Sequence, residues 1–287
     1  MTHQVGDPAV GRGADLHAHT TASDGMLSPT ELVRQASGLG LTALGVTDHD
    51  TVGGIREALT AGAAEKVTVV PGLELSTADD DLKAHVLGYF IDWEDATLVT
   101  RLGQLAALRA TRIKRMVEKL QSVGVVISLE RVLALASGGS LGRPHIARVL
   151  IEEGYVRSIS EAFDRYLSAG RPGYVERAPF TPEEGIRLIL AAGGVPVLAH
   201  PMSTGDPEAV VPRLIDTGLR GIEVYYGEYD ETTRARLRQL ADRWSLIPTG
   251  GSDFHGPGFK PGRELGGPLV DVACVDRLRG ASRANRS

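Results

Sequence analysis

Histidine and carboxylate residues occur together in several short motifs, and their spacing indicates metal-ion chemistry. The chain has eight histidines and one cysteine. In the sequence Asp-Leu-His-Ala-His, His17 and His19 are two positions apart, so both side chains project to the same side of an extended strand and can bind one ion. Because Cys274 is the only cysteine, disulfides and thiolate-rich zinc sites are excluded, and any metal must be held by nitrogen and oxygen.

Further motifs of this kind follow other apolar runs of the sequence. Their candidate ligands are Asp24, His49, Glu74, His85, His200, Asp253 and His255. Each has an ordinary structural explanation when taken alone: Asp24 suits a turn, Glu74 a buried ion pair, and His200 a helix cap or a satisfied core position. Together, without any thiol, they predict a cluster of divalent ions.

Short apolar runs alternate with helical patterns in the order expected of βα units and a parallel sheet. Seven strands are expected, at residues 14–17, 41–47, 67–73, 85–90, 195–199, 221–225 and 246–249. In a parallel barrel, the carboxyl ends of the strands meet on one face, which would gather most of the candidate ligands. His85 begins its strand, so it joins them only if that strand is antiparallel. A capping box, Ser28 with Glu31, predicts a helix that begins at Pro29.

This rhythm is interrupted between residues 95 and 180. A long amphipathic helix is expected over 98–120, followed by short helices over 129–136, 143–153 and 160–167, with a Gly-rich break at 137–140. We therefore expect a discontinuous barrel, residues 14–94 and 181–275, with 95–180 as a helical insertion that caps it. Residues 1–13 and 279–287 are expected to be flexible tails. The length of 287 residues alone fits either one α/β barrel or two domains.

Composition and charge exclude several classes of protein. Hydrophobic residues make up 42% and charged residues 23%, as in ordinary globular chains. The net charge of −5 argues against a broad basic surface for long duplex nucleic acid. Residues 95–177 nevertheless hold 13 basic and 8 acidic side chains, a charge of +5, which fits an anionic ligand. No membrane-length apolar run or signal-peptide pattern is present, so a cytoplasmic protein is expected; the sequence does not set the oligomeric state.

The motifs DLHAHTTASDG, TDHD, GLELS, LAHP and GSDFHG together resemble those of the polymerase and histidinol phosphatase (PHP) superfamily. The resemblance implies an α/β fold, a distorted (β/α)7 TIM-like barrel, with two or three Mn, Fe or Zn ions at its carboxyl-terminal face. It implies one ion at His17, His19, Glu74 and Asp253; a second at Glu74, His85 and His200; and a third at Asp24, His49 and His255. Some relatives have histidine where this chain has Asp24, so the chain departs from the family pattern at the third site. Asp48 is expected to orient a neighbouring imidazole.

Such a site favours hydrolysis of a phosphate ester. Cations that share a carboxylate lower the pKa of a bound water and neutralise the phosphate oxygens, so hydroxide can attack in line. Asp253 and His200 are candidates to assist that step. A metal-dependent amidohydrolase is an alternative, but it would favour a lysine at a strand end, and Lys66, Lys83 and Lys260 do not take that place.

The insertion bears on the choice of substrate. Arg143 and His145 open a helix, where free N–H groups and an arginine side chain favour phosphate. Alternatively, Arg143 pairs with Glu152 or Glu153, and His145 only covers the helix.

The GRPHIA segment resembles the PHP branch of nucleoside 3′,5′-bisphosphate phosphatases and 5′→3′ exoribonucleases. This implies hydrolysis of a 3′-phosphoester in a small nucleotide or a short single-stranded RNA, with Arg143 and His145 on the 5′-phosphate. A histidinol-phosphate phosphatase and a non-catalytic PHP module remain alternatives. The amine of histidinol phosphate would favour an acidic contact, and the intact set of nine ligands argues against a decayed site.

Overall fold

The computed structural model describes residues 13–136 and 139–285, and its centre is one mixed β-sheet. The strand order is β7-β6-β5-β4-β3-β2-β1-β8. The strands are β1 (Gly13–Asp15), β2 (Ala43–Val46), β3 (Thr68–Ala78), β4 (Lys83–Tyr89), β5 (Val195–Leu198), β6 (Gly221–Tyr226), β7 (Ile247–Gly251) and β8 (Val270–Asp271).

The sheet curls so that β1 meets β7. Leu16 N donates a hydrogen bond to Gly250 O (3.1 Å), and Asp253 N donates to His17 O (2.8 Å) just beyond the strand ends. The distorted seven-stranded barrel expected from the sequence is therefore confirmed. The two-residue strand β8, which pairs antiparallel with β1, was not predicted, because so short a pairing has no periodicity to detect.

The distortion comes from β4, which is antiparallel to both of its neighbours, β3 and β5. Strands β3 and β4 form a hairpin, in which Asp79 Oδ1 accepts hydrogen bonds from the backbone N–H groups of Asp81 and Leu82. His85 pairs with Ser76 in this hairpin. The start of β4 therefore lies beside the carboxyl end of β3, and His85 faces the same end of the barrel as the other candidate ligands.

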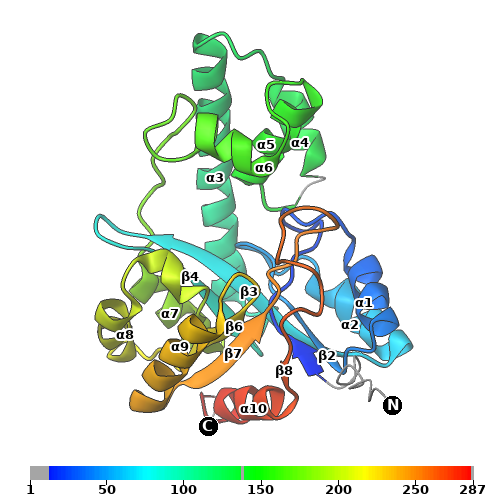
Figure 1. Cartoon of the computed structure of the whole chain (residues 1–287), viewed down its shortest axis with the longest axis vertical. Helices are drawn as coiled ribbons and strands as arrows, with labels where there is room; N and C mark the ends of the chain where they lie inside the picture. The colour runs from blue at the N-terminus through cyan, green and yellow to red at the C-terminus, as the bar shows by residue number, and fades with distance from the viewer. Residues whose placement is uncertain (1–12, 137–138, 286–287) are drawn as a thin grey trace, which may run out of the picture.

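Helices cover the outside of the barrel. They are α1 (Pro29–Gly38), α2 (Ile55–Glu65), α7 (Pro182–Ala191), η2 (Pro201–Thr204), α8 (Pro207–Ile215), α9 (Glu231–Arg243) and α10 (Ala273–Asn285). The predicted capping box is present at α1, where Ser28 and Glu31 exchange hydrogen bonds. The prediction of a flexible tail from residue 279 is wrong, because α10 runs across the base of the barrel to Asn285 (Figure 1). The other residues assigned to tails, except Gly13 in β1, lie outside the described ranges.

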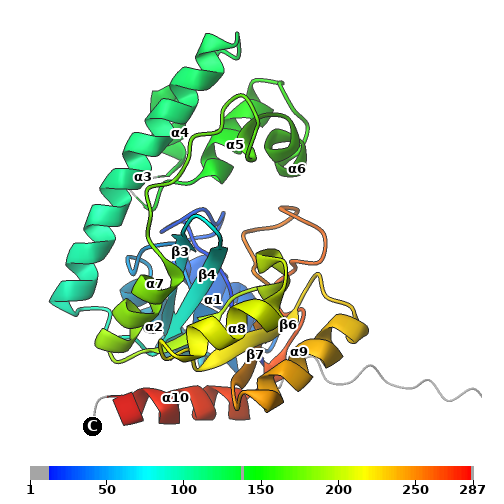
Figure 2. The same ribbon diagram turned by 90° about the vertical axis from the view of Figure 1, so that its left-hand side faces the viewer.

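The cap, as we call residues 95–180, rises above the barrel (Figures 1 and 2). It contains α3 (Ala96–Ser122), α4 (Leu129–Leu135), α5 (Arg143–Glu152), α6 (Ile159–Ala162) and the π-helical turn η1 (Phe163–Leu167). Most of its buried apolar side chains, among them Met116, Leu120 and Leu150, form a cluster of their own. Leu98 and Leu102, at the start of α3, pack instead into the core cluster of the barrel. The predicted Gly-rich break is described only at residues 139 and 140, since 137 and 138 are outside the described ranges.

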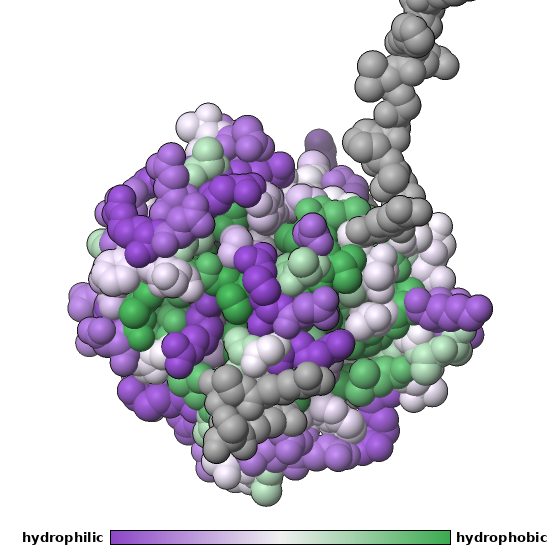
Figure 3. Space-filling model, turned by 90° about the horizontal axis from the view of Figure 1, so that it is seen from below, coloured by the Kyte–Doolittle hydropathy of each residue, from purple (hydrophilic) through white to green (hydrophobic). Residues whose placement is uncertain are grey.

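The barrel face opposite the cap is a mixed surface. Figure 3, a view from below, shows hydrophilic and hydrophobic residues interspersed over this face. Within the described residues, no helix combines the length and the apolar character needed to cross a bilayer.

Candidate metal centre

All nine predicted ligands lie together at the carboxyl-terminal face of the barrel, below the cap. They come from many elements: His17 and His19 follow β1, His49 follows β2, Glu74 lies in β3 and His85 in β4. His200 follows β5, Asp253 and His255 follow β7, and Asp24 lies in the loop between β1 and α1. The convergence follows from strand direction, because each parallel strand ends at this face and β4 begins there.

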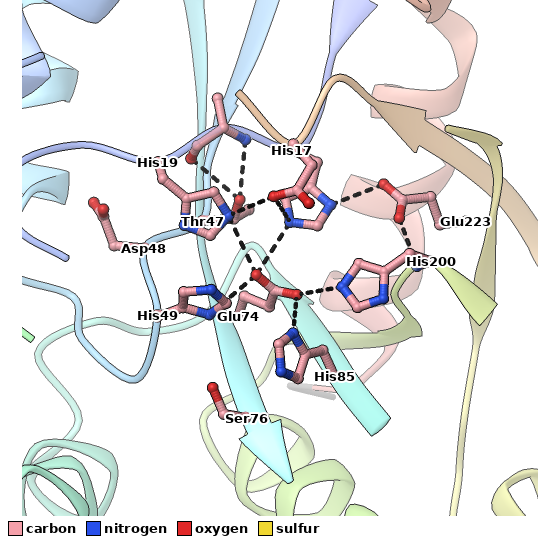
Figure 4. Close-up of polar contacts among 12 residues, drawn as sticks. His17, His19, Thr47, Asp48, His49, Glu74, Ser76, His85, His200 and Glu223 are labelled. Atoms are coloured by element: carbon pink, nitrogen blue, oxygen red, sulfur yellow. Dashed lines mark hydrogen bonds and ion pairs between the residues drawn. The ribbon is translucent and has the colours of Figure 1, made fainter. Parts of the chain in front are cut away.

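Glu74 is the centre of the group, as Figure 4 shows. Its Oε1 atom lies 2.7 Å from His85 Nδ1 and 3.0 Å from His200 Nε2. Its Oε2 atom faces three other imidazole nitrogens: His17 Nε2 and His19 Nε2 at 3.2 Å each, and His49 Nδ1 at 3.1 Å. A fully buried carboxylate with imidazoles at both oxygens is the arrangement of a bridging ligand.

Three overlapping sets of donor atoms lie close enough to hold ions. Within each set the atoms are at most 4.8 Å apart: His17, His19, Glu74 and Asp253; His49, Glu74 and His85; and His19, Asp24, His49 and His255. Several buried donor atoms lie close to other polar atoms but form no hydrogen bond of suitable geometry with a described residue, namely both ring nitrogens of His19, Asp24 Oδ1 and His49 Nδ1. Because unsatisfied buried polar atoms are costly, this donor set fits divalent cations.

Charge in the cluster is strongly perturbed. Burial alone would raise the pKa of Glu74, but the imidazoles of His49, His17 and His85 outweigh it and hold that pKa well below its ordinary value. Burial likewise opposes protonation of His19, yet contacts with Asp253 and Glu74 raise its pKa to about 10. The carboxylates are thus ready to bind cations, whereas the His19 ring must give up a proton to do so.

Further side chains hold the ligands in place. Glu223 Oε1 accepts from His17 Nδ1 (2.9 Å), and its Oε2 accepts from the backbone N–H of His200 (2.6 Å). Asp253 Oδ2 accepts from the hydroxyl of Tyr226 (2.9 Å) and lies 2.6 Å from Arg263 Nη1. These contacts leave His17 Nε2 and Asp253 Oδ1 directed toward the other candidate metal ligands.

The expected role of Asp48 is wrong. Its carboxylate contacts no imidazole of the described residues; instead it accepts hydrogen bonds from Thr20 N and Thr20 Oγ1 (2.7 Å each) and from Ser23 Oγ (2.6 Å). Neighbouring residues of an extended chain point to opposite sides, so His49 faces the site and Asp48 faces the loop beside it.

A cavity of about 810 Å³ lies between the ligand cluster and the cap. Arg143 lines it: the guanidinium lies over the Phe163 ring (5.0 Å) and donates to Leu167 O (3.3 Å). Arg143 does not pair with Glu152, which binds Arg131 instead. His145, by contrast, is 1% exposed and lies outside the cavity lining.

The ring of His145 is tied to its own helix. Its Nδ1 atom lies 3.0 Å from Gly142 N and caps the first turn of α5. The structure therefore brings Arg143, and not His145, to the cavity.

Sequence reasoning missed five other cations of this cavity: Arg109, Arg112, Arg177, Lys260 and Arg263. Arg109 forms an ion pair with Asp50, and burial followed by repulsion from Arg177 lowers its pKa to about 9. For Arg109, Arg112 and Arg177, the excess of basic residues between 95 and 177 was the available signal. It could not single out these positions, because arginine on a helix is usually a solvated residue.

Comparison with known proteins agrees with the geometry. The PHP domain family matches residues 15–176. The 3′,5′-nucleoside bisphosphate phosphatase of Chromobacterium violaceum is 33% identical over 257 residues, 88% of this chain and 90% of the relative. The 5′-3′ exoribonuclease Rnm of Escherichia coli is 35% identical over 269 residues, 91% of each chain.

A solved structure supports the same assignment. It is of a Bifidobacterium adolescentis protein whose designation as a metal-dependent phosphoesterase is provisional. It superposes with a TM-score of 0.87 at 34% identity and covers 94% of this chain and 96% of its own. With these relatives and a donor cluster suited to divalent ions, the chain belongs to the PHP domain family and is a metal-dependent phosphoesterase.

Proposed function

We propose that the protein hydrolyses the 3′-phosphoester of nucleoside 3′,5′-bisphosphates, of short 5′-phosphorylated RNA in the 5′→3′ direction, or of both. One observation carries the proposal: Arg112, Arg143 and Arg177 line the same cavity as several of the nine candidate metal ligands. A substrate with two phosphates can place one at each group. The activities for which the Chromobacterium and Escherichia relatives are named agree with such a substrate.

The arginines favour a ligand with negative charge. Among the described residues, no carboxylate lies within 4.0 Å of Arg112, Arg143 or Arg177. Burial, followed by repulsion from Arg143 and Arg177, lowers the pKa of Arg112 to about 10. Three partly buried cations without a counter-ion are unfavourable, and a phosphate would relieve that cost through paired, charge-assisted hydrogen bonds.

We assign separate tasks to the residues around the cavity. Divalent ions at the nine ligands would supply Lewis acidity toward the phosphate and lower the pKa of water. Glu74 would be shared between the ion sites, Asp253 and His200 would assist hydrolysis of the phosphoester as ligands of those ions, and Arg143 would bind the 5′-phosphate. His145 supports this indirectly, because its ring caps the helix that begins with Arg143. Mn, Fe and Zn all suit this donor set.

An activity panel tests the proposal directly. Metal-reconstituted protein is offered adenosine 3′,5′-bisphosphate, RNA oligomers with a 5′-phosphate or a 5′-hydroxyl, and histidinol phosphate. We expect activity on the first two and weak activity on the 5′-hydroxyl RNA. Preference for histidinol phosphate would contradict the proposal, and so would full activity after exhaustive chelation.

The variant Arg143→Ala tests the 5′-phosphate contact. Loss of a charge-assisted hydrogen bond is worth about 1.5–3 kcal/mol, so KM for adenosine 3′,5′-bisphosphate should rise roughly 10- to 100-fold. KM for a simple aryl phosphate should change little. Arg131→Ala, which removes an exposed arginine of the same cap, is the matched control. An equal increase in KM for both substrates in Arg143→Ala would contradict the assignment of Arg143 to the 5′-phosphate.

A further inference from the structure

The loop that carries Asp24 is held between the barrel and the cap. On the barrel side, the Asp48 carboxylate binds Thr20 and Ser23, as described above. Asp24 itself is 4% exposed, and its Oδ1 atom lies 3.4 Å from His255 Nε2 and 3.9 Å from His19 Nδ1. His19, His49 and His255 follow their strands within four residues, whereas Asp24 lies nine residues beyond the end of β1, so its position depends on what holds that loop.

The cap supplies contacts on the other side of the loop. Ser140 N donates to Ala22 O (2.7 Å), and Arg148 Nη2, from α5, donates to Asp24 O (2.6 Å). A Cβ atom at Gly139 would lie 2.4 Å from Ala22 O, so the close approach requires glycine there. Arg148 in α5, together with Gly139 and Ser140 just before this helix, thus contacts the backbone of the loop that carries Asp24.

We infer that the cap controls the third ion site: Arg148, with the backbone of Gly139 and Ser140, positions Asp24 to complete the set of His19, His49 and His255. The inference rests on the ion binding assumed in the proposed function. The ligands of the other two sets lie on or directly after barrel strands, and the contacts made by Arg148, Gly139 and Ser140 reach none of them. Loss of the cap contacts should therefore weaken the binding of one of the three ions.

The coupling must act in both directions. If docking of the cap strengthens binding at the third site, then binding at that site stabilises docking by the same factor. Binding of an ion at the third site would therefore stabilise the docked position of the cap on the barrel. Because Arg143 begins the same helix, its position relative to the ions would be fixed at the same time.

Metal content and affinity provide the main test. Metal-free protein is titrated with Zn²⁺ alone, and bound ions are counted by calorimetry and by elemental analysis after gel filtration. We expect three ions in the unchanged protein. In Arg148→Ala two ions should bind as before, while affinity at the third site falls about 10- to 100-fold, as for other residues that support ligands. Asp24→Ala should lose the third ion, and Arg131→Ala, elsewhere in the cap, should keep all three.

Gly139→Ala gives a second approach that leaves every charge in place. It should reproduce the selective loss seen with Arg148→Ala, because the added Cβ moves the cap away from Ala22. Hydrogen exchange adds a structural measurement: residues 139–150 should become more protected when the third ion binds, and should not respond in Asp24→Ala.

Three outcomes would overturn the inference. In the first, both cap variants bind three ions with unchanged affinity; in the second, they lose all ions equally. In the third, the unchanged protein binds only two ions at any Zn²⁺ concentration, which leaves the proposed phosphoesterase activity intact. Failure to bind any ion would instead remove the proposed function as well.

Discussion

Glu223 serves two ligands with one buried carboxylate. Its two oxygens separately accept hydrogen bonds from the His17 ring and the His200 backbone. The first bond fixes the tautomer of His17, so that Nε2 faces Glu74 and Asp253. The second holds His200 in a backbone conformation with φ of 26°, which is unfavourable for a residue with a side chain. These contacts make Glu223 a positioning residue for two ligands.

Glu223→Gln should weaken ion binding about 10- to 100-fold while the fold is retained. The amide offers one oxygen and one NH₂ group, so it cannot accept hydrogen bonds from both the His17 ring and the His200 N–H. Competition with a fluorescent chelator measures the affinity, and circular dichroism checks the fold. Glu183→Gln, which changes a partly buried carboxylate paired with Arg213 outside the site, is the control. Equal affinities of the two variants would contradict the assignment.

Ion binding should release protons at neutral pH. The His19 ring has a pKa raised to about 10 in the metal-free protein, so at pH 7.5 it is protonated and must lose that proton to bind a cation. Apparent affinity should therefore increase as the pH rises toward that pKa. Calorimetry in buffers with different ionisation enthalpies measures the released protons, and a binding heat that does not depend on the buffer would contradict this expectation.

At the scale of elements, the cap is stabilised by its own apolar cluster. Leu120, near the end of α3, is fully buried there, and Gly173 packs so closely on it that a Cβ at Gly173 would lie 2.7 Å from Leu120 Cδ2. The cap helices therefore hold one another in place through this cluster, and Leu98 and Leu102 at the start of α3 also pack on the barrel. This matters for function because the same helices present Arg112 and Arg143 to the cavity.

Leu120→Ala should lower the free energy of unfolding by about 2–5 kcal/mol, because it removes buried methyl groups and leaves a cavity. Leu133→Ala, in α4 of the same cap, should cost less than about 0.5 kcal/mol, since Leu133 is 47% exposed. Denaturant titration measures both. A similar cost for the two changes would show that the Leu120 environment is not a packed core.

At the scale of the whole molecule, the ion site joins parts of the chain that are distant in sequence. Its ligands come from both halves of the barrel, from residue 17 to residue 255, and the cavity above them is completed by the cap. Ions at this place would hold β1, β3 and the segment after β7 together. Metal binding should therefore stabilise the entire fold as well as the site.

Added Zn²⁺ or Mn²⁺ should raise the unfolding temperature, and a chelator should reverse the change. At a free metal concentration 100 times the Kd, one site contributes about 2.7 kcal/mol. Differential scanning calorimetry at several metal concentrations measures the effect. Glu74→Gln, which weakens the bridging carboxylate, should show a smaller increase; a Tm that is independent of metal in the unchanged protein would contradict the prediction.

The sequence by itself determined the family, the barrel and the set of nine candidate ligands. It could do so because these depend on local patterns: apolar runs that alternate with amphipathic helices, and metal-ligand residue types directly after the runs. The helix start at Ser28 was predictable for the same reason, since a capping box is complete within four residues.

Only the tertiary structure decided which side chains meet across the cavity. The antiparallel direction of β4 placed His85 in the site, and the fold directed Asp48 and His145 away from the roles that the sequence favoured. The arginines at 109, 112 and 177 face the ion ligands because the cap folds back over the barrel. Such contacts join residues far apart in the chain, and local spacing carries no information about the packing of one segment on another.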